Sequence, residues 1–237
     1  DYPNKKKYAN RLNVSKVVQK NWLKCNRKSF PIINIDNFYI YGSHNNKNYL
    51  VSKIPIKIDA STAFGTGSHE TTKCCLKAIT FISRFSKSNR ILDYGCGTGI
   101  LGIASKKIFK KSKVTFVDID KDAVKLTKEN LKLNNILLKK VYLTNSYHSN
   151  KYTKKQFYDL IFANILFGPL KKLAPLFSLI IKPNSILILS GLLFEQIPYM
   201  INWYNKYGFK EKKIFYLKGW GSVIMMRTHK ERYCTWK

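Results

Sequence analysis

The sequence predicts an α/β fold built on a doubly wound sheet of seven mostly parallel strands. From residue 56 onward, apolar runs of strand length alternate with amphipathic segments of helical length, which is the pattern of βα units. One apolar run, residues 91–93, opens into alternating glycines before a helix, as at the ligand-binding edge of such sheets. The last segments, 209–217 and 222–227, flank a short Gly-rich turn and predict an antiparallel hairpin.

The first βα units follow each other without long connections. In chain order, we expect a helix over 70–85, a strand over 90–93, a helix over 99–109, a strand over 114–118 and a helix over 122–133. The last of these helices ends at the pair Asn134 and Asn135, because asparagine tolerates the backbone of a turn.

The second half of the sheet is punctuated by Pro and Gly. We expect strands over 140–144, 159–164 and 186–190, with a helix that opens at Pro169 and another over 194–207. The run 186–190 is almost continuously apolar, which is typical of a strand buried on both faces. Gly208 provides a left-handed end for the preceding helix.

The ends of the chain differ in composition from its centre. Residues 1–55 are polar and rich in Asn and Lys, with a predicted helix over 14–24 and strand-like pieces at 37–41 and 49–51. We interpret them as an extension or linker. The main domain is predicted over 56–227, and residues 228–237 are expected to be a tail.

The chain carries a large positive charge. Its net charge of +30 at pH 7 and pI of about 9.9 favour contact with polyanions. Lysines are nevertheless spread over the whole chain together with many Asn, Ile and Tyr residues, as in a low-GC coding bias. We therefore do not interpret RNA binding as the primary function, and expect any RNA contact of the basic surface to be non-specific.

Cysteine spacing and hydropathy exclude several classes of protein. The five cysteines have no C-x-x-C spacing, which predicts reduced thiols and neither a disulfide framework nor a metal site. No apolar run is long enough to cross a bilayer, and the first residues lack the apolar core of a secretory signal. We expect a cytoplasmic protein. Because it starts at Asp1 without an initiator Met, we expect a processed chain or a fragment.

Residues 91–99, Ile-Leu-Asp-Tyr-Gly-Cys-Gly-Thr-Gly, carry the strongest ligand signal. Gly95 and Gly97 allow a ligand to lie against bare main chain. The overlapping segment 97–102 matches the G-x-G-x-x-G fingerprint of dinucleotide sites. Asp93 just before the loop would oppose a pyrophosphate, but it suits a ligand with sulfonium and ammonium groups. The loop therefore favours S-adenosylmethionine over a dinucleotide.

A second carboxylate, Asp118, ends the next predicted strand. Its distance from the glycine loop is the one expected for a carboxylate that accepts the two ribose hydroxyls of a nucleoside. Because NAD and S-adenosylmethionine share that diol, Asp118 does not discriminate between them. Asp120 and Asp122 are expected to begin the next helix, where the helix dipole favours acids.

Three segments carry a resemblance to a known family. They are residues 63–72 (Ala-Phe-Gly-Thr-Gly-Ser-His-Glu-Thr-Thr), the glycine loop over 93–100, and residues 162–170 (Phe-Ala-Asn-Ile-Leu-Phe-Gly-Pro-Leu). Together they resemble the PrmA-type methyltransferases, which methylate amines of protein eleven of the ribosomal large subunit. The first segment departs from the family at Ser68 and Glu70, where Thr and Pro are usual.

The resemblance implies a Rossmann-like class I methyltransferase sheet that uses S-adenosylmethionine. The cofactor contacts that it implies are Thr72, Gly95, Asp118 and Asn164, with the loop of Phe64, Gly65, Thr66 and Gly67 closing over the methionine end. It implies a large-subunit ribosomal protein as substrate. A non-specific contact with rRNA is predicted separately, by the basic charge of the chain. That family also carries an N-terminal recognition domain, which residues 1–55 are too few to form.

Asn164 and Ile165 are candidates for the acceptor site. The side-chain oxygen of Asn164 and the main-chain carbonyl of Ile165 can accept the hydrogens of an amine and so aim its lone pair at the methyl group. A lysine amine, with an ordinary pKa near 10.4, must first lose its proton. Phe64, Leu166 and Phe167 are expected to supply the apolar walls that favour the neutral amine.

Other functions are compatible with parts of the sequence. An NAD-dependent oxidoreductase would use the glycine loop and the pair Tyr147 and Lys151, although that spacing arises easily by chance in a Lys-rich chain with 15 tyrosines. An RNA or DNA methyltransferase fits the charge and Asn164. A ribosome-associated module without turnover fits the fold alone. The loop over 64–72 favours protein methylation.

Overall fold

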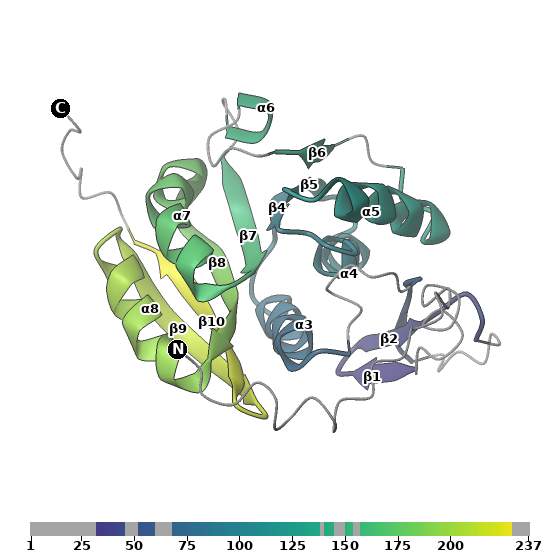
Figure 1. The fold of residues 1–237 in the computed structure, drawn as a ribbon, viewed down its shortest axis with the longest axis horizontal. Helices are drawn as coiled ribbons and strands as arrows, with labels where there is room; N and C mark the ends of the chain where they lie inside the picture. The colour runs from purple at the N-terminus through teal and green to yellow at the C-terminus, as the bar shows by residue number, and fades with distance from the viewer. Residues whose placement is uncertain are drawn as a thin grey trace, which may run out of the picture.

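The computed structural model describes residues 32–45, 52–59, 68–137, 140–144, 150–153 and 157–228. A seven-stranded sheet forms its centre (Figure 1). In sheet order the strands are β6 (Val141–Leu143), β5 (Lys113–Asp118), β4 (Arg90–Tyr94), β7 (Tyr158–Asn164), β8 (Ile181–Leu193), β10 (Trp220–Arg227) and β9 (Phe209–Leu217). Strands β4 to β8 are parallel to one another, whereas β10 pairs antiparallel with both β8 and β9, with which it forms the hairpin. The predicted fold class is confirmed.

Helices cover both faces of this sheet (Figure 1). One face carries α3 (Glu70–Ile82), α4 (Ile100–Ile108) and α5 (Lys121–Leu133), and the other carries α7 (Phe167–Ile180) and α8 (Ile197–Asn205). Neighbouring strand residues point to opposite faces, so Ile91 packs in the first core and Leu92 in the second. The short helix α6 (Asn150–Thr153) precedes β7.

A second, three-stranded sheet packs beside α3 and α4. It consists of β1 (Ile33–Ile35), β2 (Phe38–Tyr41) and β3 (Ile54–Lys57), in that order. Phe38, Ile40 and Ile56 are fully buried in the first core, so this sheet shares a hydrophobic core with the larger one. The sequence indicated β2 but neither β1 nor β3. The boundary at residue 55 stays a prediction, and the expected helix over 14–24 and strand over 49–51 lie outside the described residues.

Most elements lie within three residues of their predicted bounds, but β8 differs in length and the helix after it begins differently. β8 is longer than the predicted 186–190, because Tyr158 pairs with Ile181 and Leu160 with Ile186, which leaves a bulge between two paired parts. The predicted helix over 194–207 begins as a 3-10 turn (Phe194–Gln196), and α8 follows with a Pro in its first turn. None of the described helices is long and apolar enough to cross a membrane.

Candidate active site

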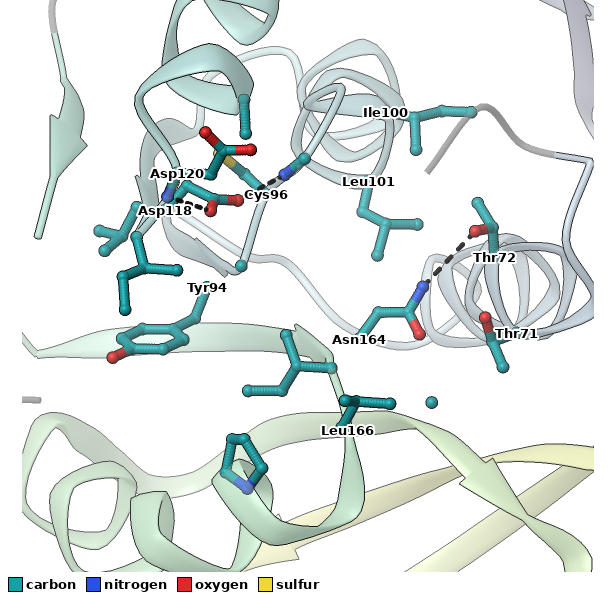
Figure 2. Close-up of a pocket in the computed structure, with 18 of the residues that line it drawn as sticks. Thr71, Thr72, Tyr94, Cys96, Ile100, Leu101, Asp118, Asp120, Asn164 and Leu166 are labelled. Atoms are coloured by element: carbon teal, nitrogen blue, oxygen red, sulfur yellow. Dashed lines mark hydrogen bonds between the residues drawn. The ribbon is translucent and has the colours of Figure 1, made fainter. Parts of the chain in front are cut away.

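A cavity of about 610 Å³ opens where β4, β5, β7 and β8 end (Figure 2). This is the edge at which doubly wound sheets bind ligands, and the volume is in the range of small-molecule and cofactor sites. Asp118 and Asp120 lie at one end of the cavity, and Asn164 and Thr72 lie at the other. The cavity therefore joins the predicted nucleoside end to the predicted acceptor end.

The glycine loop between β4 and α4 is held by Asp118. One carboxylate oxygen of Asp118 accepts the Gly97 N–H at 2.8 Å, and the other accepts the Asp120 N–H at 2.9 Å. The Thr127 hydroxyl donates to the Gly97 carbonyl at 2.9 Å. Gly95 has a φ of +71°, and a Cβ there would lie 2.4 Å from a methyl carbon of Ile165. Only glycine fits this position, because both its backbone conformation and its close neighbour exclude a side chain.

Asp93 lies beneath this loop and does not line the cavity. Its side chain is only 2% exposed, and one carboxylate oxygen accepts the Gly102 N–H in α4 at 2.8 Å. Burial raises the pKa of Asp93 to about 7, against the effect of the Gly102 hydrogen bond, and the nearby Asp118 raises it further. Asp93 therefore lies behind the glycine loop. Its predicted part in cofactor binding would be a charge interaction at a distance, without direct contact.

At the acceptor end, Asn164 meets the start of α3. Its side-chain nitrogen donates to the Thr72 hydroxyl across 3.5 Å, whereas its buried Oδ1 has no hydrogen-bond partner among the described residues. A buried acceptor without a partner is costly, so a ligand donor at this point would be stabilised. The cavity therefore presents a free acceptor at the position where the sequence predicted one.

Ile165 follows Asn164 and is fitted between two glycines. Gly191 has a φ of +82°, and a Cβ there would lie 2.3 Å from the Ile165 carbonyl oxygen. Gly95 approaches the Ile165 side chain from the glycine loop. Since both glycines line the same cavity as Ile165, the carbonyl of Ile165 is positioned by close packing.

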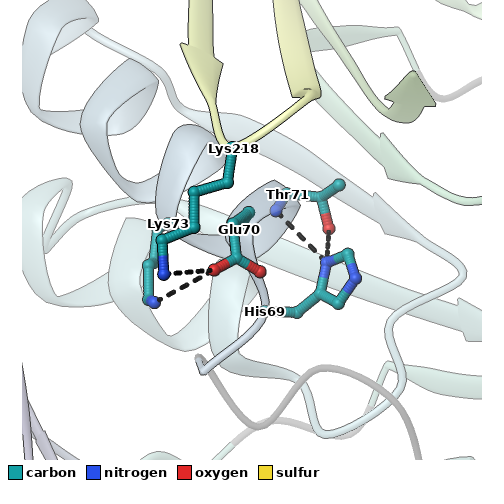
Figure 3. A network of polar contacts seen from close by, with 5 residues as sticks. All are labelled: His69, Glu70, Thr71, Lys73 and Lys218. Carbon is teal, nitrogen blue, oxygen red and sulfur yellow. Dashed lines mark hydrogen bonds and ion pairs between the residues drawn. The ribbon is translucent and has the colours of Figure 1, made fainter. Parts of the chain in front are cut away.

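Two residues that were not predicted as site residues close the acceptor end. The His69 and Trp220 rings are 5.0 Å apart in an edge-to-face arrangement, and both line the cavity. His69 also caps α3, because its Nδ1 accepts the Thr71 N–H at 3.3 Å (Figure 3). Glu70 Oε1 lies 3.8 Å from the Nζ atoms of both Lys73 and Lys218 (Figure 3), which links α3 to the hairpin turn.

The structure brings most of the predicted site residues together. Those that line the cavity are Thr72, Gly95, Gly97, Asp118, Asn164 and Ile165. Phe64, Gly65, Thr66 and Gly67 lie outside the described residues. Leu166 lines the cavity as expected, but Phe167 packs against the second core instead, so its prediction as a cavity wall was wrong. Phe167 is the first residue of α7, and its ring is partly buried against that core.

The fold and the cavity define a class I methyltransferase. A family model described as "Ribosomal protein L11 methyltransferase (PrmA)" matches residues 2–228, and the chain belongs to this family. Proteins named "Ribosomal protein L11 methyltransferase" from Rhodopseudomonas palustris (strain BisB5) and Bradyrhizobium diazoefficiens are each 32% identical to it, over 92% of this chain and 74% of theirs.

Solved structures have the same architecture. That of a ribosomal protein L11 methylase from Lactobacillus delbrueckii subsp. bulgaricus has a TM-score of 0.72 at 25% identity, and the match covers 84% of this chain and 99% of that one. A methyltransferase from Pyrococcus furiosus shares the fold. Its identity is 19% and its TM-score 0.52, and the match covers 65% of this chain and 83% of that one.

Proposed function

We propose that this chain transfers methyl groups from S-adenosylmethionine to amines of ribosomal protein L11, on lysine side chains, the N-terminal amine or both. One observation carries this proposal: the buried Oδ1 of Asn164 has no partner among the described residues and lies at the acceptor end of the cavity. An amine is a donor that would satisfy it. The names of the relatives support the ribosomal protein as substrate.

The residues of the cavity fit the proposed cofactor. Each Asp118 oxygen accepts one main-chain N–H and keeps a lone pair, so the carboxylate remains able to accept the ribose hydroxyls. The glycine loop offers bare main chain, and Thr72 in the first turn of α3 offers a hydroxyl to the methionine end. When bound, S-adenosylmethionine supplies the electrophilic methyl group.

The acceptor amine is positioned by Asn164 and Ile165. Two N–H bonds donated to the Asn164 Oδ1 and the Ile165 carbonyl would aim the nitrogen lone pair along the cavity. Leu166 and Trp220 line this end, and their apolar surfaces would shield a bound lysine amine from water, which would lower its pKa and favour its neutral form. Neither Asn164 nor Ile165 needs to act as a base if the amine enters the site in its neutral form.

Transfer of a labelled methyl group to three acceptors tests the proposal. Isolated ribosomal protein L11, naked rRNA and a reaction without acceptor are compared with the same enzyme. We expect label in the ribosomal protein alone. Label in rRNA alone would support the nucleic-acid methyltransferase, and tight cofactor binding without transfer would support a binding module.

The basic composition supports a second contact. With a net charge of +30, we infer that the chain also meets rRNA in a non-specific, salt-dependent way, and that it works in the cytoplasm where ribosomal proteins are made. An acceptor bound to RNA would suit an enzyme of this charge, since a free basic protein would be repelled. We therefore expect methyl transfer to isolated L11 to be specific but slow.

A further inference from the structure

The two edges of the parallel sheet carry different charge. We call the edge at which β4 to β8 end the carboxyl edge, and the edge at which they begin the amino edge. The chain has only 13 acidic residues, and several gather at or just beyond the carboxyl edge: Glu70, Asp118, Asp120, Asp122 and Glu195. Of these, Asp118 and Asp120 line the cavity. A uniform coding bias would not place acids preferentially beside one edge.

The amino edge is basic. Arg90 and Lys113 are the first residues of β4 and β5, and they are direct partners in the parallel register. Other basic residues at this edge are Lys87, Lys110, Lys111 and Lys140. The side chains of Arg90, Lys111 and Lys113 are exposed, and within the described residues none of these three forms an ion pair. Their charge is therefore available to a partner.

Asp159 is the acid nearest to these residues, and its charge is already used. One oxygen of its carboxylate accepts the main-chain N–H groups of Asn89 and Arg90 at 2.9 and 2.8 Å. The other oxygen meets the Lys182 ammonium at 2.5 Å. Asp159 thus links β4, β7 and β8. Because its carboxylate is already occupied by these contacts, it balances little of the positive charge of the exposed cations.

An aromatic side chain lies at the same amino edge. Phe157 immediately precedes β7, between β4 and β8, and it is 50% exposed. Cations that follow a phosphate backbone, together with an aromatic ring on which a base can stack, are the two features of sequence-tolerant binding to single-stranded nucleic acid. Among the described residues, Phe157 belongs to neither hydrophobic core.

We propose that the amino edge is a docking surface for the phosphate backbone of single-stranded RNA, with Phe157 stacking against a base. The surface deepens the rRNA contact proposed above and assigns it a location. β5 has six residues, so the two edges are roughly 20 Å apart at about 3.3 Å per residue. RNA held at the amino edge would leave the cavity open to the methyl acceptor.

Fluorescence anisotropy of a labelled single-stranded RNA tests the location with two variants of equal charge. The edge variant carries Arg90→Gln, Lys111→Gln and Lys113→Gln. The control carries Lys121→Gln, Lys125→Gln and Lys128→Gln, which are exposed on α5. Both variants lose three charges, so a diffuse attraction would weaken equally in both.

We expect the edge variant to lose about 10-fold or more in RNA affinity, and its salt slope to fall by about 2, at roughly 0.7 per lost phosphate contact. The control should change by less than about 3-fold. Equal losses in both variants, or no loss in the edge variant, would overturn the proposal. So would binding to anionic lipid vesicles that depends on the edge residues while RNA binding does not.

Two further variants separate the parts of the surface. Phe157→Ala should weaken RNA binding by about 5-fold or more with an unchanged salt slope, whereas Tyr199→Ala, an exposed aromatic residue in the first turn of α8 beyond the carboxyl edge, should have no effect. If the edge variant does not fold, Lys111→Gln alone, in an exposed turn, should still lower the slope by about 0.7. Anisotropy needs no turnover, and L11 methylation by the edge variant should stay unchanged, so failure here is distinct from failure of the proposed methyl transfer.

Discussion

The side-chain nitrogen of Asn164 donates to the Thr72 hydroxyl across 3.5 Å, which joins the end of β7 to the first turn of α3. This contact fixes which way the amide faces. The Asn164 Oδ1 is buried and without a partner among the described residues, in a side chain that lines the cavity. Besides offering its hydroxyl to the methionine end of the cofactor, Thr72 thus positions the acceptor through Asn164.

Replacement of Asn164 should affect turnover more than cofactor binding. We expect Asn164→Ala to lower kcat by about 100-fold, because the acceptor amine loses its orientation, while the affinity for S-adenosylmethionine changes little. Thr72→Val should lower kcat by less, since Asn164 is kept. Steady-state kinetics and calorimetry on the same samples measure both quantities. A loss of cofactor affinity with normal kcat would make Asn164 a cofactor contact only.

Asp118 should carry nucleoside affinity. Asp118→Ala removes an acceptor for the ribose hydroxyls and frees the Gly97 N–H, so we expect binding to weaken by about 1.5 to 3 kcal/mol. Asp122→Ala removes the same charge from the exposed start of α5 and should leave the affinity unchanged. Calorimetry of both variants measures the two affinities. Equal weakening in both would show that Asp118 acts only through its negative charge and not through hydrogen bonds to the ribose.

Asp93 should make cofactor binding depend on pH. Because its pKa is raised to about 7 by burial, the carboxyl gains its negative charge as the pH rises through neutrality. The cationic sulfonium of S-adenosylmethionine should therefore bind several-fold more tightly at about pH 8 than at about pH 6. The affinity for S-adenosylhomocysteine, which lacks that charge, should change less with pH. In Asp93→Asn, the affinities for the two ligands should change with pH to the same extent. A ratio of affinities that does not vary with pH in the native protein contradicts this reading.

Gly191 should be required by its contact with Ile165. Gly191 and Gly219 both have φ near +80°, so alanine is strained by about 1–2 kcal/mol at either position. Only at Gly191 would the new Cβ meet main-chain atoms, whereas nothing lies within 4 Å at Gly219. We expect Gly191→Ala to abolish turnover and to lower the Tm further than Gly219→Ala does. Equal effects of the two substitutions on turnover would show that the Ile165 carbonyl tolerates displacement.

Most of the sheet could be predicted because its central strands are apolar on both faces and its loops carry Gly and Asn at the turns. Asp118 and Asn164 could be predicted for the same reason, since each directly follows an apolar run and the parallel ends of β5 and β7 share one edge. The pair of His69 and Trp220 could not, because only the folded hairpin brings them together. Nor did the sequence reveal that Asp93 is buried behind the loop, since burial depends on how α4 packs.

The small sheet was missed for a different reason. β1 and β3 have three and four residues, and β1 alternates buried and exposed positions too briefly to give a periodic signal. Their pairing becomes favourable only when Phe38, Ile40 and Ile56 are buried against α3 and α4.

The central claim, that the acceptor is an amine of ribosomal protein L11 held by Asn164 and Ile165, is tested most directly by mass spectrometry of that protein after incubation with the enzyme and S-adenosylmethionine. Unmodified L11 and L11 whose amines have been acetylated are compared. We predict that methyl groups appear on amines of the unmodified protein and that the acetylated protein gains none. Equal methylation of the acetylated protein would contradict the claim.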